Sequence, residues 1–99
     1  MEKSDEQLML DVKAGDRASF DELLRRYQKP LINFLYRFVG DYEAARDLFQ
    51  ETFLRIYRYA PKYQQLANFS TFAYRIATNL AINELKKRNV RKHPCHRRW

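Results

Sequence analysis

The longest helical pattern in the chain lies between Asp16 and Gly40. Its apolar members follow one another at intervals of three, one, three, four, three, one and three residues, which places them on one face of a helix. Asp16 is a favourable N-cap, and Gly40 a favourable C-terminal residue. Pro30 removes one backbone donor inside the run and is expected to bend this helix without ending it. The apolar face comprises Phe20, Leu23, Leu24, Tyr27, Leu31, Phe34, Leu35 and Phe38.

Two shorter helices are expected on either side of this one. Ser4 and Gln7 form a capping box for a first helix that ends near Gly15. Asp41 caps a third helix, and Pro61 blocks its extension. The expected buried face of the third helix is Ala45, Leu48, Phe49, Thr52, Phe53 and Ile56.

A fourth helix is expected from about Phe69 to about Asn89, after a polar loop at residues 61–68. Asn68 or Ser70 is the expected N-cap. Because the chain has only two glycines, its composition favours helices over a turn-rich β architecture. We predict an all-α fold, a compact bundle of about four helices: a short first, a long kinked second, a third, a loop and a long fourth. The expected buried face of the fourth helix is Phe69, Phe72, Ala73, Ile76, Ala77 and Leu80.

Charge is strongly segregated along the chain. Residues 1–51 carry 8 basic and 11 acidic side chains, whereas residues 52–99 carry 11 basic and one acidic. The net charge of +7 is therefore −3 in one half and +10 in the other, so only the second half suits a polyanion. A solvated basic surface without a partner is the simpler alternative.

Length and composition narrow the class of protein further. A chain of 99 residues supports one small domain, and the single Cys95 excludes an internal disulfide. Neither a signal peptide nor an apolar run of about 18 residues is present, so we expect a cytoplasmic protein without membrane insertion.

One face of the expected fourth helix combines cations with amides. Cations neutralise phosphates and asparagine can pair with a base edge, so this mixture suits nucleic acid, although a solvated helix face is the alternative. At about 100° per residue, this face contains Arg75, Thr78, Asn79, Ile82, Asn83 and Lys86.

Aromatic residues gather just before this face. An unstacked base regains about 1–3 kcal/mol by stacking on a ring beside positive charge, as single-stranded nucleic acid requires. Phe69 and Phe72 lie on the apolar side of the helix, so a core position is the favoured interpretation for them over a ligand-binding one. Tyr63 and Tyr74 lie off that side.

The outer face of the third helix has a different character. Leu54 is expected to be exposed there among Asp47, Gln50 and Glu51. An apolar anchor inside a polar rim is typical of a protein-docking patch, and its acidity disfavours nucleic acid. Single exposed leucines are also ordinary, so a plain solvated face is an equal alternative.

Catalytic and metal-binding patterns are weak. Asp47 and Glu51 share a face, but no histidine or lysine is placed with them by the sequence, and no glycine-rich phosphate loop exists. His93, Cys95 and His96 lack a further zinc ligand nearby and are more often a chance grouping. We expect no enzyme activity, no cofactor and no metal.

Two motifs in this order resemble region 2 of bacterial RNA polymerase sigma factors, and most closely the extracytoplasmic-function (ECF) group of the sigma-70 family. They are DLFQETF at residues 47–53 and FSTFAYRIATNLA at residues 69–81. The resemblance spans about residues 5–92. It implies a region 2 domain over residues 1–92, followed by a basic tail or the start of a linker at 93–99. Region 4, the second helical domain of the family, does not fit in 99 residues.

The resemblance also implies partners and roles. In the family, the helix with the first motif docks on the β′ clamp helices of core RNA polymerase, and the loop and last helix recognise and melt the promoter minus-ten element by capturing a flipped non-template base. An anti-sigma factor is a further partner of many members. The implied polymerase contacts are Asp47, Gln50, Glu51, Leu54 and Tyr57. The implied DNA contacts are Tyr63, Asn68, Phe69, Ser70, Thr71, Tyr74, Arg75, Asn79, Asn83, Lys86 and Lys87.

The sequence departs from the family pattern in its last helix, and two other functions remain as alternatives. Phe72 stands where a tryptophan is usual, so any wedge role falls to a smaller ring, and Leu80 or Ile82 offers no polar contact. A free-standing helix-turn-helix regulator of duplex DNA is the main alternative function. A membrane-surface or purely protein-binding helical module is the second.

Overall fold

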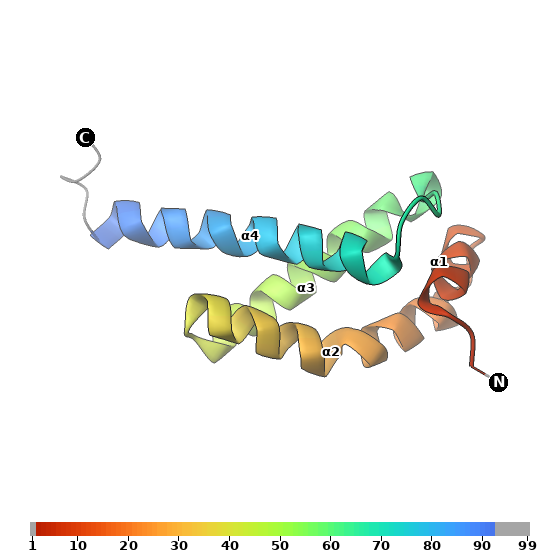
Figure 1. Cartoon of the computed structure of the whole chain (residues 1–99), viewed down its shortest axis with the longest axis horizontal. Helices are drawn as coiled ribbons and strands as arrows, with labels where there is room; N and C mark the ends of the chain where they lie inside the picture. The colour runs from red at the N-terminus through yellow and green to blue at the C-terminus, as the bar shows by residue number, and fades with distance from the viewer. Residues whose placement is uncertain (1, 93–99) are drawn as a thin grey trace.

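A computed structural model describes residues 2–92, with side chains described as far as Asn89. Within this range the chain is helical and contains no strand, which confirms the predicted all-α class. α2 is the central element and packs against α1, α3 and α4 (Figure 1). The elements are α1 (Asp5–Lys13), α2 (Arg17–Val39), α3 (Tyr42–Tyr59), the 3-10 turn η1 (Ala60–Lys62) and α4 (Phe69–Lys92).

The first three helices begin where the sequence predicts because a side chain caps each of them. Ser4, Asp16 and Asp41 each accept a hydrogen bond from a backbone amide two or three residues later. Gly40 ends α2 at a φ of 74°, a left-handed conformation that lets α3 start almost at once. These boundaries are therefore set by local chemistry.

α2 continues through Pro30, as predicted. Pro30 is exposed, so the carbonyl that its ring leaves without a donor can reach water. The ribbon of α2 changes direction about half-way along its length, so that the helix curves around the core (Figure 1). The predicted apolar face is buried at Leu23, Tyr27, Leu31 and Leu35, and its remaining members are half-buried at the edges.

α4 packs on α2 and α3 through a row of small residues. Ala73, Ala77 and Ala81 have no exposed surface and recur every four residues along the helix. Phe72, Ile76 and Leu80 were expected to be buried but are half-buried, and Ala81 takes the position expected for Leu80. Small side chains allow the helix backbones to approach closely, which leaves the larger residues at the margins of the contact.

α4 begins at Phe69, as predicted, but its C-terminal end differs from the prediction. The helix reaches Lys92, three residues beyond the expected end, and its last turns extend past α2 and α3 (Figure 1). The expected tail at 93–99 lies outside the described residues.

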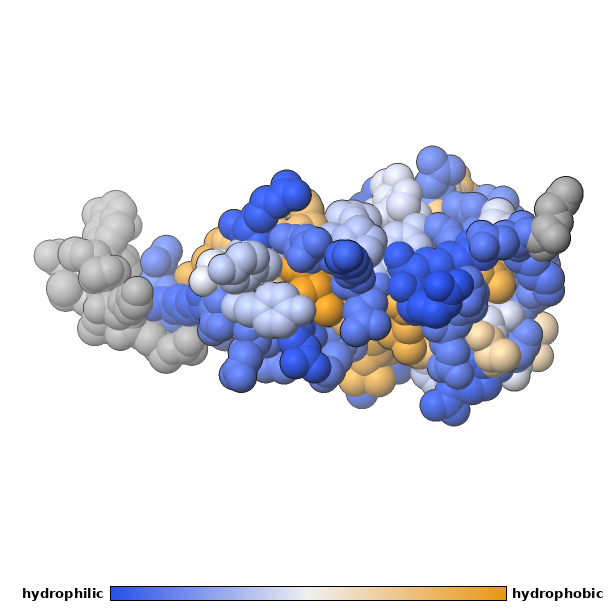
Figure 2. Space-filling view, turned by 90° about the horizontal axis from the view of Figure 1, so that it is seen from below, coloured by the Kyte–Doolittle hydropathy of each residue, from blue (hydrophilic) through white to orange (hydrophobic). Residues whose placement is uncertain are grey.

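The surface on the side of α2 is mostly hydrophilic, with apolar side chains visible only in small separate areas (Figure 2). None of the helices in the described range is both long and apolar enough to span a bilayer.

Ala77→Leu is expected to lower the free energy of unfolding by about 1–3 kcal/mol, because a fully buried alanine leaves no room for a larger side chain. Chemical denaturation followed by circular dichroism measures this change. Ala18→Leu is the matched control at an exposed position of α2 and should change the free energy by less than about 0.5 kcal/mol. Equal losses in the two variants would contradict close packing through the alanine row.

Candidate nucleic-acid interface and docking face

The polar face predicted for the last helix is present on α4. Arg75, Asn79 and Asn83 recur every four residues and are exposed, as are Lys86 and Lys87 in the following turn. Cations and amides therefore form one continuous stripe along the outer side of α4. Such a stripe can neutralise phosphates and offer paired donors and acceptors to base edges.

An aromatic pocket of about 290 Å³ lies where the loop joins the start of α4. The ring of Phe72 lies 5.3 Å from that of Tyr59 and 6.0 Å from that of Tyr63. Arg75 brings a positive charge to the same pocket. Rings beside a cation provide the two interactions that an unstacked nucleotide needs. The pocket is lined by Tyr59, Tyr63, Gln64, Leu66, Ala67, Thr71, Phe72 and Arg75.

Two of the implied DNA contacts are more buried than a contact role requires. Tyr63 was expected off the apolar side, but only 3% of it is exposed, and its ring forms a wall of the pocket. Phe69 is fully buried, and its ring packs on that of Tyr27 at 5.4 Å. Phe69 is therefore a core residue whose side chain cannot reach DNA in this structure. Tyr74 is half-buried, with its ring 5.0 Å from that of Phe34.

The remaining loop residues lie close to the pocket. Asn68 and Thr71 are exposed, whereas Ser70 is half-buried. The carbonyl of Asn68 accepts from the amide of Phe72 at 3.2 Å, so Asn68 occupies the N-cap position of α4. The side-chain cap comes from elsewhere, since Glu6 Oε2 accepts from the amide of Phe69 at 2.6 Å. Asn68 is therefore the N-cap residue by position, as predicted, but the side chain that accepts from the first amide of the helix is that of Glu6 on α1.

Sequence reasoning missed one residue of the pocket, Tyr59. Gln64, Leu66 and Ala67 lie in the loop to which the family resemblance assigns base capture, from Tyr63 to Asn68. Tyr59 is the last residue of α3, and the turn η1 folds the loop back beside it. The aromatic residue two positions before Pro61 is the signal that could have found Tyr59.

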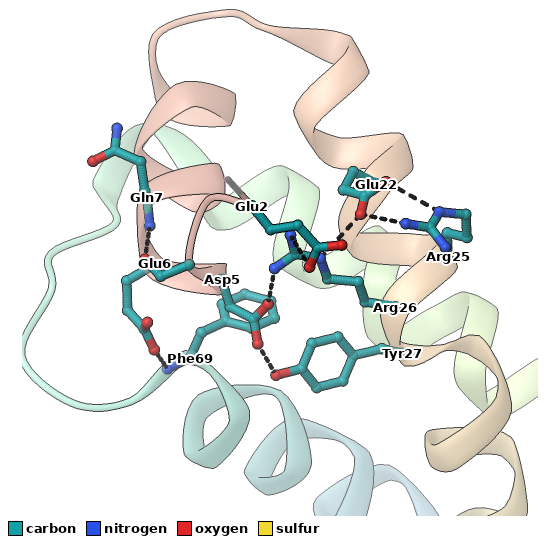
Figure 3. A network of polar contacts seen from close by, with 10 residues as sticks. Glu2, Asp5, Glu6, Gln7, Glu22, Arg25, Arg26, Tyr27 and Phe69 are labelled. Carbon is teal, nitrogen blue, oxygen red and sulfur yellow. Dashed lines mark hydrogen bonds and ion pairs between the residues drawn. The ribbon is translucent and has the colours of Figure 1, made fainter.

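A network of polar contacts fixes α1 beside α2 and the start of α4 (Figure 3). Asp5 accepts from Arg26 Nη1 at 2.8 Å and from the hydroxyl of Tyr27. Glu22, one turn before Arg26 on α2, accepts from Arg26 Nε at 3.0 Å. Burial, reinforced by the hydrogen bond to Asp5, raises the pKa of Tyr27 far above its ordinary value. The Tyr27 phenol therefore remains a hydrogen-bond donor at all physiological pH values.

The docking face predicted on α3 is also exposed. Leu54 and Tyr57 are each 43% exposed, and Asp47 and Gln50 are exposed on the same helix. Glu51 is half-buried and binds Arg55 at 2.9 Å. The two surfaces thus lie on different helices, the docking face on α3 and the polar stripe on α4.

An apolar groove between α2 and α3 extends this face. The guanidinium of Arg17 lies 5.7 Å from the ring centre of Tyr57, a favourable cation–π arrangement. Phe20 and Leu24, at the half-buried edge of the α2 stripe, were not predicted to belong to this face. The groove is lined by Arg17, Phe20, Leu24, Gln50, Phe53, Leu54 and Tyr57.

A metal site finds no support in the part of the chain that the structure describes, where no three His, Cys, Asp or Glu side chains cluster. His93, Cys95 and His96 lie outside the described residues.

Comparison with known proteins identifies the family of this fold. Residues 23–91 match the family model of sigma-70 region 2. The chain belongs to the sigma-70 region 2 family. This confirms the resemblance drawn from the two motifs.

Relatives of this region 2 domain include ECF factors. The RNA polymerase sigma-H factor of Pseudomonas aeruginosa is 38% identical over 90 residues, which cover 91% of this chain and 47% of the relative. The ECF RNA polymerase sigma factor SigW of Bacillus subtilis is 34% identical over 88 residues, covering 89% and 47%. This chain therefore spans about half the length of these relatives.

The fold is also found in a solved structure. An NMR structure of an engineered region 2 of sigmaE, in complex with GTAAAA, is 34% identical and matches with a TM-score of 0.80. The match covers 90% of this chain and 93% of that one.

Arg26→Met is expected to lower the free energy of unfolding by about 1.5–3 kcal/mol, because it leaves the carboxylate of Asp5 without its charged donor. Arg25→Met is the control on the same helix, since Arg25 binds only Glu22 and is 69% exposed. This exposed pair is screened by solvent, so Arg25→Met should leave the free energy of unfolding nearly unchanged. Thermal and chemical denaturation of both variants measure the difference, and similar losses would mean that Arg26 is not a structural anchor.

Proposed function

We propose that this region 2 domain docks on core RNA polymerase and recognises and melts the promoter minus-ten element by capturing a flipped non-template base. The aromatic pocket beside the polar stripe of α4 is the observation that carries the proposal. The related region 2 of sigmaE was solved in complex with GTAAAA, which supports a nucleic-acid ligand for this surface.

The proposed DNA contacts follow from exposure and chemistry. Lys86 and Lys87 hold phosphates, Asn79 and Asn83 face base edges, and Arg75 lies where the stripe meets the pocket. These groups hold the strand along α4. Flanking contacts from Asn68, Ser70, Thr71 and Tyr74 complete the interface at the loop end.

Binding energy alone drives melting in this proposal. Flipping a base costs a few kcal/mol, whereas stacking on an aromatic ring returns about 1–3 kcal/mol per base, and the phosphate contacts add to this. The flipped base would enter between the loop and Phe72, against Tyr59 and Tyr63. Phe72 offers a smaller stacking surface than the tryptophan usual in the family.

The proposed polymerase contacts are on α3. Asp47, Gln50 and Glu51 would bind the β′ clamp helices through their polar groups, and Leu54 and Tyr57 would supply apolar area at the groove. The basic stripe on α4 remains free for DNA in this arrangement. We also expect an anti-sigma factor among the partners, and a cytoplasmic site of action.

Fluorescence anisotropy with labelled minus-ten oligonucleotides tests the DNA half of the proposal. The domain should bind the single strand at least about tenfold more tightly than the matching duplex, a difference of about 1.4 kcal/mol. A strong preference for duplex would overturn the proposal and favour a helix-turn-helix reader.

The same assay assigns the phosphate contacts through salt dependence. Lys86→Ala should lower the slope of log K against log salt by about 0.7, the value for one phosphate on a single strand. Lys29→Ala, an exposed cation on α2, is the control and should leave the slope unchanged. A slope that fell equally in both variants would indicate non-specific attraction to the whole domain.

Gln50→Ala should weaken binding to a β′ clamp-helix fragment and leave oligonucleotide affinity nearly unchanged, because Gln50 lies on α3 and away from the stripe on α4. Asp47→Ala should behave in the same way. Asp21→Ala, which removes an exposed carboxylate of α2, is the control. Equal losses of both affinities would show that the two surfaces are not separate.

A further inference from the structure

Both ends of the pocket loop are attached to the same helix, α1. At the start of the loop, Lys13 Nζ donates to the carbonyl of Tyr63 at 2.7 Å. At its end, the amide of Phe69 donates to Glu6 Oε2 at 2.6 Å. The two bonds join residues 50 and 63 positions apart in the sequence, so they are tertiary contacts.

The loop has little backbone hydrogen bonding of its own. Among the described residues, its interior contributes one such bond, from the amide of Leu66 to the carbonyl of Gln64 at 2.8 Å. Tyr63 also donates its amide to the carbonyl of Ala60 at 3.0 Å, in the turn before the loop. The two contacts to α1 therefore carry much of the constraint on where the loop lies.

Tyr63 depends on this constraint in particular. Its ring is a wall of the pocket, yet its buried hydroxyl has no hydrogen-bond partner within the described part of the chain. Burial, together with the negative charge of Glu6, raises the pKa of Tyr63. Packing and the Lys13 contact hold Tyr63 in place, because its own hydroxyl does not.

α1 is a firm support for these contacts. Leu8, Met9 and Val12 are buried in the core, and Asp5 is bound to Arg26 and Tyr27 of α2. α1 also lies before residues 23–91, the segment that matches the family model. Its two contacts to the loop therefore join Lys13 and Glu6, which precede the matched segment, to Tyr63 and Phe69 within it.

We propose that α1 is a positioning element for base capture, and that Lys13 and Glu6 hold the loop in its binding geometry without touching DNA. This rests on the proposed function. A loop that is already ordered loses less conformational entropy when it binds, so affinity and base discrimination both depend on the two contacts.

The test compares disruptive and conservative variants at each position. Lys13→Met and Glu6→Ala remove the contacts, whereas Lys13→Arg keeps a donor and Glu6→Gln keeps an acceptor. Lys3→Met is the control. It also removes a cation near the start of the chain, but Lys3 binds Asp11 and not the loop. Denaturation curves establish that each variant is folded at the assay temperature.

The probes are a single-stranded hexadeoxynucleotide GTAAAA and six copies of it, each with one abasic position. The unchanged chain should lose affinity for at least one abasic copy. Lys13→Met and Glu6→Ala should each weaken binding of the intact probe about fivefold, the effect of losing one helix-cap or comparable hydrogen bond, and should reduce its advantage over that abasic copy. Most of the affinity for the intact probe and of its advantage over the abasic copy should remain in three variants: Lys13→Arg, Glu6→Gln and Lys3→Met.

Salt dependence separates positioning from phosphate contact. Lys13→Met should leave the slope of log K against log salt unchanged, in contrast to Lys86→Ala, because Lys13 binds a carbonyl of the protein. A lower slope in Lys13→Met would overturn the positioning role.

The remaining outcomes are distinguishable. If the unchanged chain binds every abasic copy as well as the intact probe, base capture itself is wrong. If the unchanged chain discriminates and both Lys13→Met and Glu6→Ala discriminate equally well, base capture stands and the role of α1 is wrong.

Discussion

Two neighbouring carboxylates of α1, those of Asp5 and Glu6, connect this helix to α2 and to the start of α4. Asp5 binds Arg26 and Tyr27 of α2, and Glu6 binds the first amide of α4. The first amides of a helix have no partner within the helix, and leaving a partly buried one unpaired is costly. Glu6 removes this cost and thereby fixes where α4 begins relative to α2. The pocket and the polar stripe both take their positions from that point.

The packing of α4 explains how one helix serves as both core and interface. Its buried row consists of Phe69 followed by three alanines, and the opposite side of the helix stays free for polar groups. The groove between α2 and α3 has a different chemistry, with a mostly apolar lining, the amide of Gln50 and the cation of Arg17. The two surfaces therefore differ in chemistry as well as in the helices that form them.

Sequence reasoning succeeds here where the deciding interaction is local. Ser4, Asp16, Asp41 and Gly40 each act on residues no more than four positions away, so these helix boundaries follow from the sequence. Helical periodicity also predicts correctly that Leu54 and Arg75 are exposed. Sequence reasoning fails where the deciding partner is distant. Asn68 and Ser70 are good caps by type, but the cap on Phe69 comes from Glu6, and the burial of Tyr63 depends on how the loop folds onto α1. Neither contact leaves a periodic pattern to detect.

The cap that Glu6 places on α4 also joins an early part of the chain to a helix that is synthesised later. The residues of α1, α2 and α3 leave the ribosome first, and the neighbouring helices can already pack while α4 is still being made. The amide of Phe69 meets its partner only after a further stretch of chain has emerged. The pocket therefore depends on a contact between two residues that are synthesised 63 positions apart, so it cannot form until both have emerged.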